Sequence, residues 1–70
     1  MEKEILIEGM HCEHCSKAVT EALEKVNGVR RVSVDLKKKI AVVDVENVKD
    51  EILAEAIDSI GFEATNITEH

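Results

Sequence analysis

The apolar residues of this chain switch twice between the alternation of a strand and the spacing of a helix. Residues 3–8 alternate, with Ile5 and Ile7 on one face, which predicts a first strand. From about Ser16 onward the apolar residues form one helical stripe, made of Ala18, Val19, Ala22, Leu23 and Val26. Gly28 is expected to end this helix, because glycine is the usual left-handed residue at a helix terminus.

The second half of the chain repeats this order. Residues 32–36 alternate and predict a second strand. A polar turn at residues 37–39 leads to a third strand at residues 40–45, whose expected core face is made of Ala41, Val43 and Val45. A second helix is expected from about Lys49, with a stripe made of Ile52, Leu53, Ala56, Ile57 and Ile60.

Gly61 is expected to end that helix, and residues 62–67 to form a last short strand. The complete order is strand-helix-strand, twice over. Two such units predict an α+β, ferredoxin-like βαββαβ sandwich, in which both helices cover one face of a four-stranded antiparallel sheet. Aliphatic side chains must fill its core, since Phe62 is the only aromatic residue.

Length and charge exclude several classes of function. Seventy residues predict a single domain, residues 1–70, with no room for a deep substrate cavity, so no enzymatic activity is expected. The net charge of −6 argues against binding to nucleic acid or to an anionic membrane surface. The longest apolar run, residues 40–43, is far below the roughly 20 residues of a membrane span. A cytosolic protein is predicted, although a mature form that has lost its signal peptide stays open.

The reactive side chains are concentrated between the first strand and the first helix, in the segment G-M-H-C-E-H-C at residues 9–15. Cys12 and Cys15 are spaced so that the turn brings both sulfurs close together, and the free N–H groups of a helix start favour thiolates. Two exposed thiolates suit a soft metal of low coordination number, of which Cu(I) is the leading candidate. Met10 is expected to anchor the loop in the core rather than to bind metal.

This segment resembles the heavy-metal-associated domain family, which includes small copper chaperones and the metal-binding domains of copper-transporting ATPases. The resemblance rests on G-M-x-C-x-x-C at residues 9–15, N-G-V at 27–29 and I-G-F at 60–62. It implies a cytosolic chaperone that binds Cu(I) through Cys12 and Cys15. It also implies transfer by ligand exchange to a copper-transporting ATPase or a copper regulator. A monomer is expected, with a metal-bridged dimer as the alternative.

Two departures from the family pattern keep other carriers open. His11 stands where the family commonly has a small hydroxyl residue, and Phe62 stands where bacterial chaperones often have Tyr. In the ATPase-attached domains and the mercury-binding relatives that this chain resembles, Phe is common at this position. A mercuric-ion or zinc carrier, or a metal-binding domain of an ATPase, therefore remains an alternative, while the start at Met1 favours a free-standing protein.

Other readings of the site residues rank lower. Direct metal ligation by His11 or His14 is a minority interpretation, because a structural zinc site usually needs four converging ligands. A dithiol redox pair ranks last, since the chain has no proline to serve as the cis-Pro of a thioredoxin-like fold. Lys17 is the favoured electrostatic partner of the thiols.

Two further expectations concern residues outside the cysteine segment. The lysines at 37–39 are read as a solvated turn that lies away from the metal loop. His70 is expected to be a disordered terminal residue.

Overall fold

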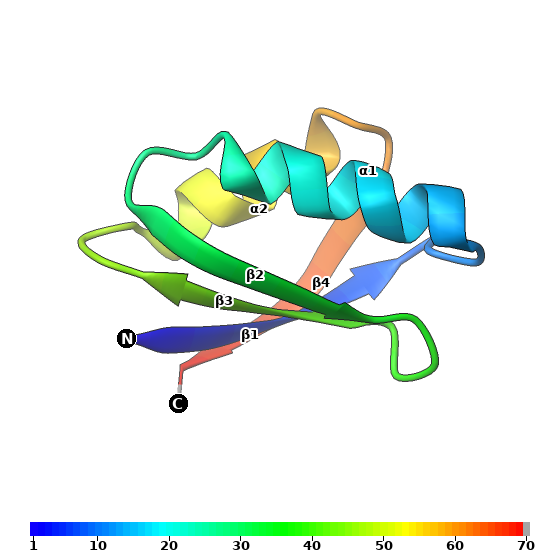
Figure 1. Cartoon of the computed structure of the whole chain (residues 1–70), viewed down its shortest axis with the longest axis horizontal. Coiled ribbons are helices and arrows are strands. Elements are labelled where there is room, and N and C mark those ends of the chain that lie inside the picture. Colours follow the sequence, from blue (N-terminus) through cyan, green and yellow to red (C-terminus); the bar gives the residue numbers. More distant parts are fainter. Residues whose placement is uncertain (70) are drawn as a thin grey trace.

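The computed structural model describes residues 1–69 and contains the six predicted elements in the predicted order, so the expectation for His70 lies outside the described residues. The elements are β1 (Glu2–Glu8), α1 (Glu13–Glu24), β2 (Val29–Asp35), β3 (Ile40–Val45), α2 (Asp50–Asp58) and β4 (Glu63–Glu69). The strands form one antiparallel sheet in the order β2-β3-β1-β4, and both helices lie on one face of it (Figure 1). The predicted ferredoxin-like sandwich is confirmed.

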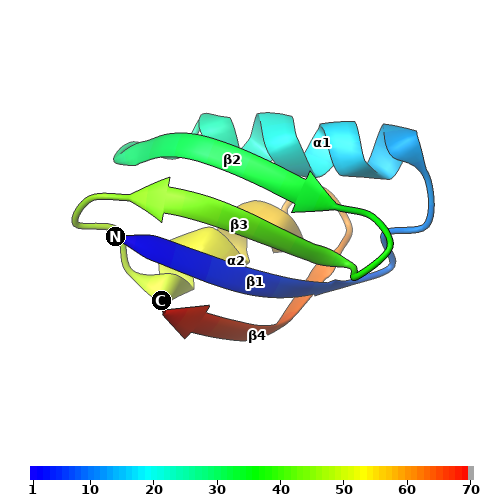
Figure 2. The same ribbon diagram turned by 60° about the horizontal axis from the view of Figure 1, so that its bottom comes forward.

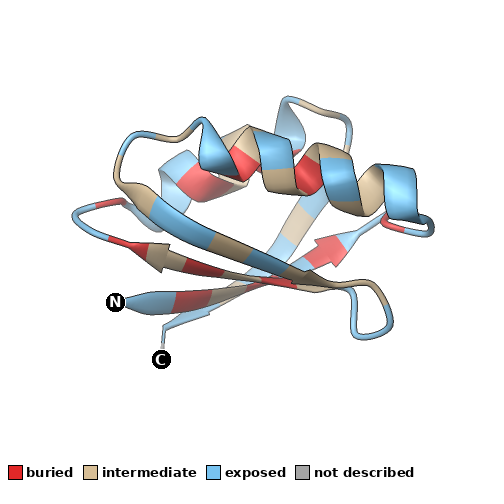
Figure 3. Ribbon diagram, in the orientation of Figure 1, coloured by how far each residue is buried: buried red, intermediate tan, exposed pale blue. Residues whose placement is uncertain are grey.

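The core lies between the sheet and the helices and is almost entirely aliphatic (Figure 3). Its buried residues are Ile5, Ile7, Met10, Val19, Leu23, Ala41, Val43, Val45, Val48, Leu53 and Ile57. The predicted core face of β3 is therefore confirmed. Ile52 was expected in the stripe of α2, but its side chain is 46% exposed, which makes that prediction wrong. Ile52 lies about 100° around the helix from Leu53, so the two side chains cannot both point directly at the sheet.

Several element boundaries differ from the predictions. α1 begins at Glu13 rather than near Ser16, because the N–H of Ser16 already donates to the carbonyl of Cys12 at 3.1 Å. The apolar stripe begins only after this first polar turn. Phe62 lies outside β4, and its N–H donates instead to the carbonyl of Ile57 at 3.3 Å.

β2 begins three residues before the predicted start and stops one residue before the predicted end. Val29 pairs with Val45 and Arg31 with Asp44, so Arg30 is an extra residue in the ladder. A bulge of this kind breaks the alternation of side chains. The alternating pattern of apolar residues therefore does not predict the first part of the strand.

The lysine turn does not lie where the sequence placed it. β1 and β3 are antiparallel, so the end of β1 lies beside the start of β3. The N–H of Ile7 donates to the carbonyl of Lys39 at 2.8 Å. The turn therefore lies at the same end of the molecule as the loop of residues 9–12 (Figure 2), and the expectation that it lies away from this loop is wrong.

Lys3 ties β1 to the start of α2 at the opposite end of the sheet. Its side chain is almost completely buried, and its Nζ donates to the carbonyl of Val48 at 3.1 Å and to Oδ1 of Asp50 at 2.5 Å. These charge-assisted hydrogen bonds satisfy an ammonium group that would otherwise be costly to bury. They hold the first turn of α2 against the central strand.

No helix within residues 1–69 combines the length and the apolar content that a membrane span requires.

Gly28 is predicted to be the most sensitive glycine for stability. It has a φ of +100°, and a Cβ there would lie 2.6 Å from Cγ2 of Val48 and 2.7 Å from the carbonyl oxygen of Glu46. Gly28→Ala should lower the free energy of unfolding by about 2–4 kcal/mol, because overpacking adds to a left-handed backbone. Urea denaturation measures this change.

Gly61→Ala is the matched control for that measurement. Gly61 has a φ of +89°, but a Cβ there would meet nothing within 4 Å. It should cost only the backbone penalty, about 1–2 kcal/mol. Equal losses for the two variants would contradict the role of the Val48 contact.

Candidate metal centre

Met10 fixes the candidate metal loop to the core. The chain leaves β1 at Gly9, whose φ of +93° turns it away from the sheet. Met10 then enters the core with no exposed surface. The predicted anchoring role of Met10 is confirmed, and its thioether is buried among apolar side chains. The residues on either side of this anchor, Gly9 and His11, remain at the surface.

Cys12 and Cys15 meet at the start of α1. Cys12 is the N-cap residue with an extended backbone (φ −146°, ψ 169°), and Cys15 lies in the first turn of the helix. Their Sγ atoms are 3.3 Å apart, and both thiols are free. Cys12 is exposed and Cys15 half-buried. The sequence therefore correctly placed the two sulfurs together at an open surface.

The local hydrogen bonds favour the thiolate form of Cys15. The side chain of Cys12 contributes most to lowering the pKa of the Cys15 thiol below its usual value, and the backbone N–H of His11 contributes next. Partial burial acts in the opposite direction but is the weaker influence. A thiol whose pKa is lowered is available as a metal ligand at a lower pH, because the thiolate is the form that coordinates.

The histidines of the segment do not join the thiols. His11 and His14 are exposed, and among residues 1–69 no three His, Cys, Asp or Glu side chains converge as they would around a metal ion. Lys17, the expected electrostatic partner, is also exposed on α1. The described arrangement thus offers two sulfur donors and no third ligand, which suits a soft ion of low coordination number better than a closed tetrahedral site.

The loop between α2 and β4 lies against the metal loop. A Cβ on Gly9 would approach Cδ1 of Phe62 to 3.2 Å, so the phenyl ring is already close to the backbone of the loop. An open hollow beside this ring is lined by Glu8, Gly9, Asp58, Gly61, Phe62 and Glu63. These three carboxylates were not among the predicted site residues. The antiparallel pairing of Glu8 with Glu63 would have revealed two of them.

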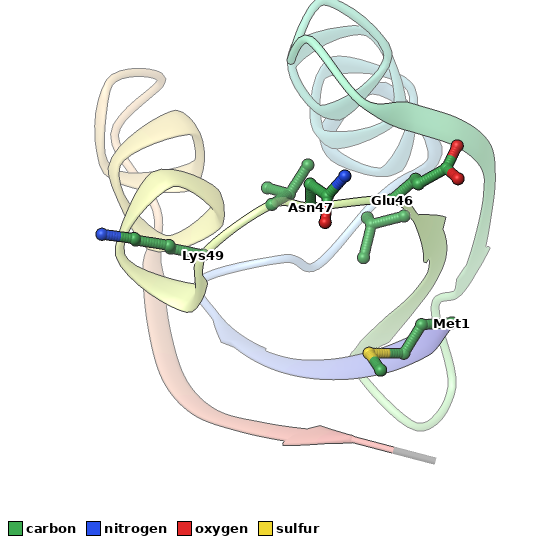
Figure 4. Close-up of a pocket in the computed structure, with 6 residues that line it drawn as sticks. Met1, Glu46, Asn47 and Lys49 are labelled. Carbon is green, nitrogen blue, oxygen red and sulfur yellow. The ribbon is translucent and has the colours of Figure 1, made fainter.

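A second hollow lies at the opposite end of the sheet and contains no thiol. It is open to the surface and has a volume of about 520 Å³. Figure 4 shows Met1, Glu46, Asn47 and Lys49 around it, and Val45 and Val48 complete its lining. Because no Cys or His lines it, this hollow is not a candidate for a soft metal.

Comparison with known proteins agrees with the fold. Residues 4–63 match the heavy-metal-associated domain family. The chain belongs to this family. The match places it among metal-binding domains rather than enzymes.

Its relatives include whole proteins of the same size. The chain is 39% identical over 66 residues to the copper chaperone CopZ of Enterococcus hirae, covering 91% of this chain and 96% of CopZ. It is 44% identical over 63 residues to the copper chaperone CopZ of Staphylococcus haemolyticus, covering 87% and 93%. The crystal structure of a copper binding domain from HMA7, a P-type ATPase, matches with a TM-score of 0.90 and 40% identity, covering 99% of this chain and 96% of that chain.

The geometry of the thiols predicts how Cys15 titrates. Cys12→Ala removes the hydrogen bond that contributes most to lowering the pKa of Cys15. The pKa of Cys15 should therefore rise toward its usual value, and its reaction with iodoacetamide near neutral pH should slow. The thiolate absorbance near 240 nm, followed against pH, measures the shift.

His14→Ser is the matched control for this titration, since His14 is exposed in the same segment and has no part in lowering that pKa. It should leave the titration of Cys15 unchanged. An unchanged titration in Cys12→Ala would contradict the role assigned to the Cys12 side chain.

Proposed function

We propose that this protein is a cytosolic copper chaperone, a single heavy-metal-associated domain formed by residues 1–70. In this proposal Cys12 and Cys15 bind one Cu(I) ion. The observation that carries the proposal is the pair of free sulfurs 3.3 Å apart at an open surface, with no third ligand converging on them among residues 1–69. Cu(I) accepts two soft ligands, whereas a structural Zn(II) site usually takes four.

The open site supports transfer by ligand exchange. Cys12 is exposed at the N-cap, so the sulfur of an incoming thiolate can approach the metal without any opening of the core. Met10 anchors the loop in the core, so the outer side of the loop stays free. The partner in this proposal is the cysteine pair of a copper-transporting ATPase or of a copper regulator, in line with the CopZ and HMA7 relatives. The acidic charge of the chain serves docking and solubility.

Competition with a Cu(I) chelator tests the binding step. The double variant Cys12→Ser/Cys15→Ser should lose at least about a hundredfold in Cu(I) affinity, because a hydroxyl is a poor ligand for a soft ion. Titration of the chelator complex, followed by its absorbance, gives the affinity. Binding by the double variant that equals the wild type would refute the assignment of these two ligands.

His11→Ser separates the copper chaperone from a zinc carrier. His11 is exposed and does not converge with the thiols, so this variant should keep the wild-type affinity for Cu(I). If Zn(II) binding falls while Cu(I) binding does not, His11 tunes the choice of metal without carrying the copper site. A large loss of Cu(I) affinity in His11→Ser would contradict a site of two thiols.

Hg(II) is the second candidate cargo, because a pair of exposed thiolates also suits this soft ion. Parallel titrations with Cu(I) and Hg(II) compare the two. Transfer to an acceptor domain with its own cysteine pair decides between them: a chaperone for copper should exchange Cu(I) reversibly with that domain.

A further inference from the structure

The connection between α1 and β2 contains the sequence N-G-V at residues 27–29, which has no part in the proposed function. This connection lies at the opposite end of α1 from the cysteine segment (Figure 1). Asn27 is exposed, and Gly28 follows it directly. The chain thus presents a side-chain amide to water immediately before a residue that has no Cβ.

A tight turn encloses the peptide bond between Asn27 and Gly28. The N–H of Val29 donates to the carbonyl of Val26 at 3.2 Å, which closes a turn of four residues. Gly28 is the third of these residues and has a φ of +100°, as the third position of a type II turn requires. The carbonyl of Gly28 in addition accepts from the N–H of Glu46 at 2.9 Å. The peptide units before and after the Asn27–Gly28 bond are therefore each held by a hydrogen bond.

The peptide unit between Asn27 and Gly28 has no such restraint. Among residues 1–69, no group donates to the carbonyl of Asn27, and the N–H of Gly28 donates to no acceptor. A peptide plane without these bonds rotates between its fixed neighbours at low cost, and Gly28 has no Cβ that would oppose the rotation. Rotation of this plane brings the backbone nitrogen of Gly28 toward Cγ of Asn27.

We infer that Asn27 is a site of spontaneous deamidation, a covalent modification that needs only water. The backbone nitrogen of Gly28 loses its proton and attacks Cγ of Asn27. The bond between Cγ and Nδ2 breaks, Nδ2 takes up a proton, and ammonia leaves behind a five-membered succinimide ring. Water then opens the ring at one of its two carbonyl carbons. One opening gives aspartate, and the other gives isoaspartate, whose main chain is one methylene longer.

The other two asparagines lack the features of this site. Asn47 precedes Val48 and Asn66 precedes Ile67, so in both places a β-branched side chain crowds the attacking nitrogen. Asn66 also lies within β4, where it is paired with β1, and rotation of its peptide plane would disturb that pairing. Deamidation is therefore expected at Asn27 and not at the other two.

Isoaspartate at residue 27 should destabilise the fold without changing the thiols. A Cβ on Gly28 would lie 2.6 Å from Cγ2 of Val48, so the turn has little space for a longer main chain. The thiols lie beyond the other end of α1, a helix of 12 residues. A helix of this length separates the two places by about 18 Å. The deamidated chain should therefore unfold at a lower urea concentration but bind Cu(I) as the unmodified chain does.

Incubation of the folded, reduced chain at physiological pH and temperature tests the site. Peptide mapping with electron-transfer fragmentation, which distinguishes isoaspartate from aspartate, should find a mass gain of about 1 Da at residue 27 and none at Asn47 or Asn66. Both products should appear at residue 27. Aspartate without isoaspartate would indicate direct hydrolysis of the amide and overturn the ring mechanism. No change at Asn27, or equal change at all three asparagines, would overturn the inference.

The same measurement on the chain unfolded in guanidinium chloride tests the role of the unrestrained peptide unit. Because little structure has to open around it, Asn27 in the folded chain should react at most about tenfold more slowly than in the unfolded chain. A larger difference would show that the fold protects Asn27, and it would overturn the inference for the native protein.

Asn27→Gln is the matched control for stability. It keeps an exposed side-chain amide, but its ring would have six members and would close far more slowly. The urea midpoint of this variant should stay constant during the incubation, whereas that of the wild type should fall as isoaspartate accumulates. An equal fall in both would overturn the assigned effect of residue 27.

Chelator competition keeps this inference separate from the proposed function. Fresh and incubated wild type should have the same affinity for Cu(I), and a loss that follows the isoaspartate content would contradict the separation of the two sites. A fresh chain that fails to bind Cu(I) would refute the proposed function and leave the deamidation site intact.

Discussion

The antiparallel pairing of β1 with both β3 and β4 is the constraint on which the rest of this structure depends. Because β1 lies between β3 and β4 and is antiparallel to both, the chain leaves β1 next to the start of each of these strands. The turn before β3 and the connection before β4 consequently lie at the same end as the cysteine loop (Figure 1). One topological fact thus places the thiols, the lysine turn and Phe62 together, although more than forty residues separate the cysteines from Phe62.

This arrangement resolves two demands that oppose each other. The proposed exchange of metal requires an exposed site, but an exposed loop has few contacts to fix its shape. The chain meets both demands by alternating the two roles within a few residues: Met10 is completely buried, whereas Cys12 is exposed. The helix that begins at Glu13 then sets the position of Cys15 relative to Cys12. The sulfurs are held by elements whose own stability comes from the core.

Sequence reasoning predicted the six elements, the sheet and the meeting of Cys12 with Cys15, because each of these follows from local periodicity or spacing. Apart from Ile52 and the start of α1, the errors arose where two strands had to be compared. The place of the lysine turn depends on the register of Leu6 with Ile40, and the start of β2 depends on the extra residue Arg30. Such features arise from pairing between distant segments, and a pattern read along one segment does not contain them.

The same distinction explains why composition misrepresents the site. The net charge of −6 suggests a surface that is acidic throughout, and therefore a docking partner of the opposite charge. The fold separates the signs at the thiol end, with lysines on the side of β3 and carboxylates on the side of β4. A partner meets this local pattern at close range, since the screening length is shorter than the molecule, whose longest extent is 29 Å. The pattern of charge near the thiols, rather than the total charge, is therefore the electrostatic feature that would orient a docking partner at this end of the chain.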